Sequence, residues 1–184
     1  MRALLILCAV LALAGCQKEA GEPANESATA VPAGPVKGVD RSHKGKPAPD
    51  ATFSDPDGGE TSLAELSGKP MLVNLWATWC APCVKELPTL GRLSKSGGVQ
   101  VVAISQDSGP HPSVAAFLDS HAPELEPYQD SKMALSGGLG AEVLPTSILF
   151  DAQGKEVWRY VGDLDWTSPE AAKLLSEAGA AQHS

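Results

Sequence analysis

Two cysteines separated by two residues, Cys80 and Cys83, suggest the first chemistry in this sequence. The apolar run 70–77 before them predicts a strand covered on both faces, and apolar residues at every third position predict a helix over about 81–94. A helix start presents unpaired N–H groups and a positive dipole, which stabilise a thiolate. We therefore expect Cys80, at the exposed end, to attack a partner disulfide and Cys83, one turn deeper, to resolve the mixed disulfide.

A Cys-X-X-Cys spacing also occurs in half of a zinc site and in static disulfides. A structural zinc ion takes four ligands, and the sequence holds no second pair of closely spaced cysteines. The histidines follow no recognisable ligand spacing and are interpreted as surface residues: His43, His111, His121 and His183. We therefore expect neither a metal nor a cofactor at the cysteine pair.

The composition narrows the class of protein. A chain of 184 residues fits one domain with an appendage, because domains commonly have roughly 100–150 residues. The net charge is -8, and no stretch concentrates Lys and Arg. Nucleic-acid binding depends on such clusters, so the composition argues against a nucleic-acid partner.

Residues 1–15 have the features of a secretory signal, with Arg2 followed by an apolar run over 3–14. This run is too short to cross about 30 Å of hydrocarbon as a helix. Its end, Leu13-Ala14-Gly15-Cys16, resembles the bacterial lipobox, in which the cysteine becomes the first residue and carries a lipid. An ordinary signal peptide with an incidental cysteine is the alternative. We expect a lipid on Cys16 and a location on the extracytoplasmic, periplasmic side of a bacterial membrane.

Residues 16–46 are expected to form a lipidated, flexible tether. They are rich in Ala, Gly, Pro, Ser and charge and contain no aromatic residue, so they bury too little apolar area to offset their ordering entropy. Every aromatic residue lies between Phe53 and Trp166. This distribution places the folded domain at 47–178 and leaves 179–184 as a frayed C-terminus.

Strand and helix patterns alternate through the domain. After the helix at 81–94, a buried strand over 99–104 completes a right-handed strand–helix–strand unit. The remaining patterns predict helices at 112–120, 131–136 and 167–178, the last opened by a capping box, and a hairpin of strands at 146–150 and 156–161. The fold class is therefore α/β, with a mixed central sheet flanked by helices and preceded by an N-terminal extension.

The chain resembles the thioredoxin-fold thiol–disulfide oxidoreductases of the TlpA/ResA-like group over most of residues 47–178. The matching pieces are the residues 79–83 (WCAPC), 73–79, 84–88, Leu144-Pro145-Thr146 and Gly162. The resemblance implies a thioredoxin-like fold with Pro145 in the cis form against the disulfide. It also implies that Leu144 offers its backbone to an extended substrate segment, with Trp79 and Thr146 as neighbouring substrate-binding residues. A trans Pro145 that simply starts the following strand is the alternative.

Glu86 is the predicted proton acceptor. Asn74 occupies the place where thioredoxin carries a buried acid, and an amide cannot accept a proton in that role. Glu86 follows Cys83 by three residues, so the two share a helix face, and it matches the acid of the TlpA/ResA-like group. Pro88 resembles the kink of the group and is expected to turn Glu86 towards the cysteines. A solvated helix residue is the alternative for Glu86.

These features predict a lipid-anchored extracytoplasmic enzyme that reduces specific protein disulfides. The resemblance implies clients in cytochrome c maturation or copper-site assembly, and a membrane-bound redox partner that recharges the cysteines. A peroxiredoxin-type peroxidase is one alternative, but its Pro and its Thr or Ser before the cysteine are replaced here by Val73 and Ala77. A copper-binding assembly chaperone is another, but it needs three residues between its cysteines and a later His, where this chain has Ala81-Pro82 and Pro145.

Overall fold

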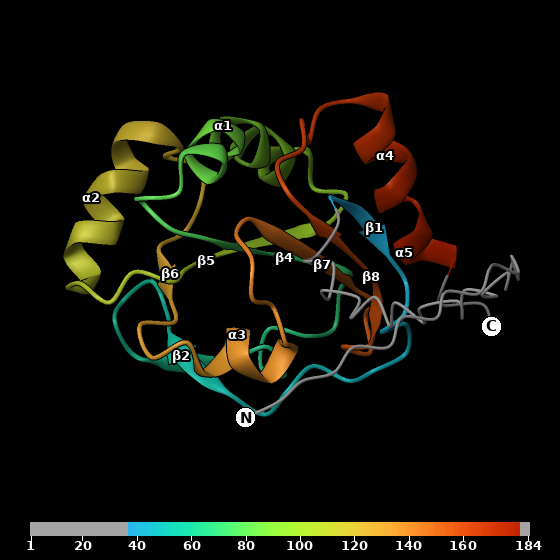
Figure 1. Ribbon diagram of the computed structural model, residues 1–184, viewed down its shortest axis with the longest axis horizontal. Coiled ribbons are helices and arrows are strands. Elements are labelled where there is room, and N and C mark those ends of the chain that lie inside the picture. The colour runs from blue at the N-terminus through green and yellow to red at the C-terminus, as the bar shows by residue number, and fades with distance from the viewer. Residues whose placement is uncertain (1–36, 181–184) are drawn as a thin grey trace, which may run out of the picture. The chain divides into compact units, whose positions relative to one another are not determined.

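The computed structural model describes residues 37–180 (Figure 1). The expected signal peptide, Cys16, the tether before residue 37 and residues 181–184 lie outside them. The described residues form an eight-stranded mixed sheet in the order β1-β8-β7-β4-β5-β6-β2-β3. Its strands are β1 (Gly38–Asp40), β2 (Thr52–Ser54), β3 (Glu60–Ser62), β4 (Met71–Trp76), β5 (Gln100–Ser105), β6 (Tyr128–Gln129), β7 (Thr146–Phe150) and β8 (Glu156–Val161).

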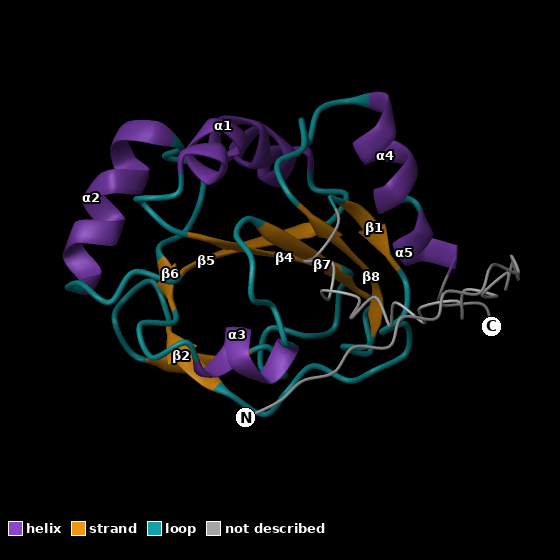
Figure 2. Ribbon diagram, viewed as in Figure 1, coloured by secondary structure: helices purple, strands orange, loops and turns teal. Residues whose placement is uncertain are grey.

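Helices cover both faces of the sheet (Figure 2). Their bounds are α1 (Ala81–Ser96), α2 (His111–His121), α3 (Ala134–Leu139), α4 (Pro169–Leu175) and α5 (Glu177–Ala180). In Figure 1, α1, α2 and α4 lie over one face and α3 lies against the other. Each face has its own apolar core, one including Leu87, Leu118 and Leu174 and the other including Leu135 and Phe150. No helix within residues 37–180 is both long and apolar enough to cross a membrane.

The central strand β4 is buried along its whole length, as its apolar sequence predicts. It pairs in parallel with β5 and antiparallel with β7, and α1 makes the crossover from β4 to β5. The predicted hairpin is also confirmed, because β7 and β8 pair antiparallel around a turn in which Gly154 has a φ of 71°. The mixed sheet flanked by helices therefore agrees with the predicted fold class.

Helix α1 begins immediately after Cys80, which is its N-cap residue. Pro82 lies in the first turn, where the missing N–H breaks no intrahelical hydrogen bond. Pro88 lies inside the helix, and Gly97 ends it in the left-handed conformation that glycine adopts readily. The local sequence thus places the start of a long helix directly at the cysteine pair.

The tether prediction was wrong for residues 37–46. Gly38–Asp40 form β1, which pairs antiparallel with β8, and Gly45 N–H donates to the Glu156 carbonyl at 2.7 Å. Lys46 in turn accepts from Glu156 N–H at 2.8 Å. These contacts use the main chain, so they need no apolar side chains and leave little trace in a composition analysis. The folded part therefore begins before the predicted boundary at residue 47.

Other differences concern short elements. The strands β2, β3 and β6 have only two or three residues each and were not predicted. The short helix α3 lies three residues later than the predicted 131–136, because it runs through Gly137-Gly138 and is capped by Gly140. Ser168, rather than Thr167, caps α4 by accepting from Ala171 N–H, and the helical run is divided into α4 and α5.

Candidate active site

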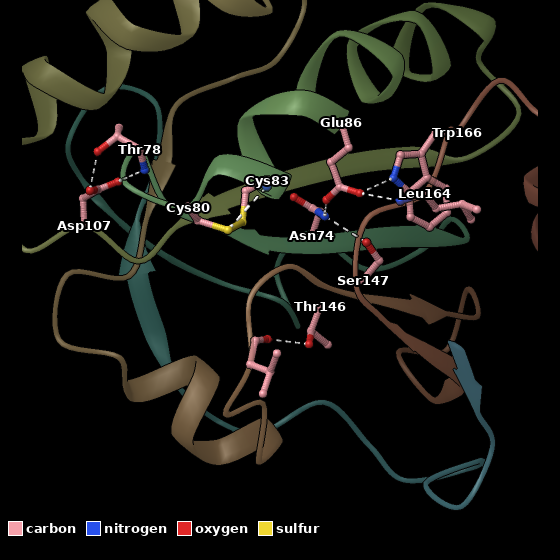
Figure 3. Close-up of a disulfide and its surroundings, with 11 residues drawn as sticks. Asn74, Thr78, Cys80, Cys83, Glu86, Asp107, Thr146, Ser147, Leu164 and Trp166 are labelled. Carbon is pink, nitrogen blue, oxygen red and sulfur yellow. Dashed lines mark hydrogen bonds between the residues drawn. A yellow bond between two sulfur atoms is a disulfide. The ribbon is translucent and has the colours of Figure 1, made fainter. Parts of the chain in front are cut away.

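Cys80 and Cys83 form a disulfide at the N-terminus of α1, with a sulfur–sulfur distance of 2.03 Å (Figure 3). The Cys83 N–H donates to Cys80 Sγ at 3.4 Å, so one sulfur lies at the exposed N–H groups of the helix start. Cys80 is 6% exposed and Cys83 is fully buried, whereas the preceding Trp79 is 68% exposed. Cys80, which follows the exposed Trp79, is therefore the more accessible of the two cysteines, and Cys83 is shielded.

Glu86 lies one turn beyond Cys83 on α1 and is buried, with 2% of its surface exposed. Its Oε1 accepts from Asn74 Nδ2 at 2.8 Å, and its Oε2 accepts from Leu164 N–H at 3.1 Å and from Trp166 Nε1 at 3.2 Å (Figure 3). Burial raises the pKa of Glu86 to about 7, although these three donors act in the opposite direction. Glu86 can therefore exchange a proton near neutral pH, and the solvated alternative is excluded.

Asn74 links Glu86 to the sheet. Its Nδ2 donates both to Glu86 Oε1 and to the Ser147 hydroxyl, each at 2.8 Å. Asn74 and Ser147 are paired residues of β4 and β7, which explains why the two side chains meet on the face covered by α1. The Oδ1 atom of Asn74 is buried and has no hydrogen-bond partner among the described residues.

The Leu144–Pro145 peptide bond is cis. It immediately precedes β7, and Thr146 pairs with Leu75 near the end of β4, so the bond lies at the end of the sheet that leads to the cysteines. Leu144 packs against both apolar cores. Its backbone N–H and C=O have no hydrogen-bond partner within residues 37–180, which leaves them available to a bound segment. The hydroxyl of Thr146 instead donates to the Val143 carbonyl at 2.7 Å, and this side chain is buried.

A second set of contacts fixes the loop before Cys80. Asp107 accepts from the backbone N–H and the hydroxyl of Thr78 (Figure 3). Gln129 donates to the Asp107 carbonyl at 2.7 Å, which joins this loop to β6. The loop before Cys80 is therefore held by the segment that follows β5, which is itself bonded to β6.

A pocket of about 190 Å³ reaches Glu86 from the surface; it is lined by Lys85, Glu86, Thr89, Asp163, Leu164 and Asp165. Asp163 forms ion pairs with Lys37 at 2.7 Å and with Lys85 at 3.4 Å at this opening. The hydrogen bond from Lys37, followed by that from Lys85, holds the pKa of Asp163 below its usual range. The pocket gives the buried carboxyl a path for proton exchange with solvent.

The sequence predictions agree with the structure for the cysteines, Glu86 and Pro145, but they miss several residues that contact this group. Cys80, Cys83 and Glu86 gather at α1, and the cis form of Pro145 agrees with the expectation. Sequence reasoning missed Leu164 and Trp166, which lie about 80 positions after Glu86 and give no local signal of the contact. It also missed Asp107. Within residues 37–180, no three His, Cys, Asp or Glu side chains are grouped so that they could hold a metal ion.

The chain matches the protein family described as Redoxin over residues 43–175. It is 34% identical over 122 residues to a protein named thiol-disulfide oxidoreductase ResA from Bacillus thuringiensis (strain Al Hakam), covering 65% of this chain and 70% of that protein. It is also 34% identical over 141 residues to a protein named thiol:disulfide interchange protein DsbE from Pseudomonas fluorescens biotype C, covering 73% and 79%.

A similar fold is found in the crystal structure of a candidate thiol:disulfide interchange protein DsbE from Chlorobium tepidum. The TM-score is 0.60 at 29% sequence identity, and the match covers 75% of this chain and 96% of that one. The sequence match, the shared fold and the Cys80–Cys83 disulfide agree with one another. The chain therefore belongs to the Redoxin family and is a thioredoxin-fold thiol–disulfide oxidoreductase of the ResA/DsbE type.

Proposed function

We propose that the protein is a membrane-anchored, extracytoplasmic reductase of specific protein disulfides. The observation that carries this proposal is the arrangement of the dithiol site: an accessible Cys80 beside the exposed Trp79, with the buried Cys83 and Glu86 behind it. Because Cys80 is only slightly exposed and Cys83 is fully buried, a client that docks against Trp79 can reach Cys80 while Cys83 stays shielded.

In the proposed reaction the reduced enzyme acts first through Cys80. Its thiolate attacks one sulfur of the client disulfide, forming a mixed disulfide, and the other client sulfur leaves as a thiolate that takes a proton from solvent. Cys83 then gives its proton to Glu86 and attacks Cys80 Sγ, which releases the second client sulfur. The client gains two electrons, and the enzyme is left with the Cys80–Cys83 disulfide of the structure.

Glu86 supplies the base for the second step. A pKa of about 7 lets this carboxyl accept a proton and later release it at neutral pH. Its position one turn along α1 from Cys83 and its pocket to solvent support the same role.

Client binding is proposed to use three features around the disulfide. Trp79 offers an exposed aromatic surface, and the free backbone groups of Leu144, before cis-Pro145, can pair with an extended client segment. Thr146 contributes by fixing the turn, through its bond to the Val143 carbonyl, rather than by direct contact.

The location and the partners rest on sequence. The lipobox-like segment ending at Cys16 supports a lipid anchor on the periplasmic side of a bacterial membrane. Clients from cytochrome c maturation or copper-site assembly, and a membrane-bound donor of electrons, are proposed from the resemblance to the TlpA/ResA-like group.

Trapping of clients tests the function. In Cys83→Ser, the mixed disulfide at Cys80 has no resolving thiol and should accumulate, so that non-reducing electrophoresis and mass spectrometry identify the client. The matched variant Cys80→Ser should trap much less. If Cys80→Ser trapped more, the roles of the two cysteines would be reversed.

The base is tested by stopped-flow reduction of a trapped client's disulfide. Glu86→Gln should slow the reaction at neutral pH by roughly 10²-fold, the lower end of general-base contributions. The rate of the unchanged protein should rise with pH as Glu86 ionises, and this rise should be absent from the variant. Equal rates and pH profiles would show that Glu86 does not accept the proton.

A further inference from the structure

The hydrogen bonds around Glu86 fit only its ionised form. All three side-chain and backbone groups that contact the carboxyl are N–H donors: Asn74 Nδ2, Leu164 N–H and Trp166 Nε1. A carboxylate accepts hydrogen bonds at both oxygens, but a carboxylic acid must also donate one. When Glu86 takes up a proton, this arrangement offers its O–H no acceptor among these contacts.

An acceptor lies on the same side chain that now donates. Asn74 Oδ1 is buried and has no hydrogen-bond partner within the described residues. Asn74 Nδ2 donates one hydrogen bond to Glu86 and one to Ser147 (Figure 3). A half-turn of the carboxamide exchanges Oδ1 and Nδ2. Oδ1 would then accept from the acid of Glu86 and from the hydroxyl of Ser147, because a hydroxyl both donates and accepts.

We infer that the Asn74 carboxamide turns over with the protonation state of Glu86, donating from Nδ2 to the carboxylate and accepting at Oδ1 from the carboxylic acid. Without the turn, protonation leaves two buried polar groups unpaired, the Glu86 hydroxyl and Asn74 Oδ1. With the turn both of these groups are paired, and the two N–H protons of Asn74 Nδ2 take the place that Oδ1 leaves. The turn is favoured because it replaces the meeting of the Glu86 O–H with an N–H donor by an O–H···O hydrogen bond. Asn74 is therefore a positioning residue that supports both forms of the acid, with Ser147 as its second partner.

The charged groups around Glu86 come from several elements. Asp163, in the loop after β8, opposes ionisation of Glu86, but it is paired with Lys37 before β1 and Lys85 on α1. On β8, burial raises the pKa of Tyr160, and the charge of Glu86 contributes in the same direction. None of these groups donates to or accepts from the Asn74 carboxamide, so the turn responds to the proton on Glu86 itself.

The inference rests on Glu86 gaining and losing a proton, which the proposed function also uses. The two can fail separately, because the turn would be measured in the oxidised protein without a client. The rate of client reduction by Glu86→Gln tests the proposed reaction. The orientation of Asn74 is measured separately, by nuclear magnetic resonance at equilibrium.

The direct test follows two signals in the oxidised protein across a pH titration: the carboxyl carbon of Glu86 and the side-chain amide protons of Asn74. The Overhauser contacts of these protons with Glu86 and Ser147 should weaken as Glu86 is protonated, with the same midpoint. In Glu86→Gln the amide of the new residue faces Asn74, so the turned arrangement should persist at every pH. Contacts that remain unchanged while Glu86 titrates would overturn the inference.

A variant supplies an independent measurement. Asn74→Leu keeps the branched shape of the side chain and removes both polar groups, so it should destabilise the protein on both sides of the Glu86 titration and move the midpoint of that titration by less than about half a pH unit. If the Asn74 carboxamide instead always donates to Glu86, Asn74→Leu should raise the midpoint of the Glu86 titration by roughly one to two pH units. The variant should then lose stability only at high pH. That second pattern would overturn the inference.

Ser147→Ala is the matched control. It removes the other partner of the same carboxamide without touching Glu86, so the turn should remain and keep its midpoint. Loss of the turn in this variant would show that Ser147 sets the orientation of Asn74, and it would overturn the role given to Glu86.

Discussion

Asp107 holds Thr78 at two atoms: Oδ2 accepts from the backbone N–H at 3.0 Å, and Oδ1 accepts from the hydroxyl at 2.7 Å. The Ser105 hydroxyl also donates to Asp107 Oδ2 at 2.6 Å, so the carboxylate is itself fixed to β5. Thr78 directly precedes Trp79 and Cys80. The position of Cys80 thus depends on a carboxylate in the segment that follows β5.

Asp107→Ala should therefore release the loop before Cys80. We expect the free energy of unfolding to fall by about 1–3 kcal/mol, since the Thr78 groups lose a charged acceptor, and kcat/KM for client reduction to fall as well. Denaturant unfolding and client kinetics measure the two effects. Asp107→Asn keeps one acceptor oxygen and should lie between the two proteins. Unchanged unfolding and kinetics in Asp107→Ala would contradict this role.

Stability should depend on pH through Glu86. The pKa of this carboxyl is raised by burial from 4.5 to about 7, so the folded protein binds the proton more tightly than the unfolded chain. Its contribution is greatest below pH 4.5, falls between 4.5 and about 7, and is constant above. The total change is on the order of 3 kcal/mol.

The difference in unfolding free energy between the oxidised protein and Glu86→Gln isolates this effect, because all other carboxyl groups titrate alike in both. The difference should change steadily across this pH window and level off above it. A difference independent of pH would show that Glu86 titrates like an exposed residue.

Trp79→Ala should weaken client binding without weakening the fold. The side chain is 68% exposed, so its removal should change the unfolding free energy by less than about 0.5 kcal/mol. The KM for the client should rise, while resolution by Cys83 is unaffected. Met133→Ala is a matched control, because Met133 is an exposed large apolar residue, at 51%, before α3. Equal effects of the two substitutions on KM would contradict a specific role for Trp79.

Removal of residues 37–46 should destabilise the protein, although the sequence placed them in a tether. A chain that starts at Pro47 loses β1, the ion pair of Arg41 with Glu177 and the main-chain bonds to Glu156. A chain that starts at Pro35 retains them and should melt like the longer protein. Thermal unfolding followed by circular dichroism compares the two. Equal melting temperatures would show that residues 37–46 do not contribute to the stability of the fold.

Cys16→Ser should release the protein from the membrane fraction and remove the lipid mass from its N-terminal peptide. Client reduction by the released protein should be unchanged per molecule, because the described site contains no residue before Lys37. Fractionation and mass spectrometry give the result. A membrane-bound, unlipidated protein would exclude anchoring through Cys16.

The sequence predicted the long elements because their signals are local. Each of these signals is contained in a short stretch of sequence: the apolar run of β4, the helix pattern after Cys80 and the glycine turn between β7 and β8. Strands of two or three residues carry no such pattern. Strand β1 in particular forms by pairing with β8, more than a hundred positions away, and only the fold brings the two together.

The same distinction holds in the site. The roles expected for Cys80 and Cys83 follow from their spacing at the start of a helix, and that of Glu86 follows from its spacing after Cys83 and from the resemblance to the TlpA/ResA-like group. The donors of Glu86 could not be found in this way, because Leu164 and Trp166 arrive from the loop after β8. Asn74 was recognised as the residue that replaces an acid, but its bond to Glu86 depends on the packing of α1 over β4.

The register of the edge strand also determines where the chain enters the fold. Gly38 pairs with Val161, which in turn pairs with Thr146, so the chain enters the fold at the end of the sheet that holds cis-Pro145. Any attachment upstream of Lys37 therefore joins the domain at this end. A lipid at Cys16 would thus hold the domain by the end that carries the disulfide and keep that end within reach of client segments close to the membrane.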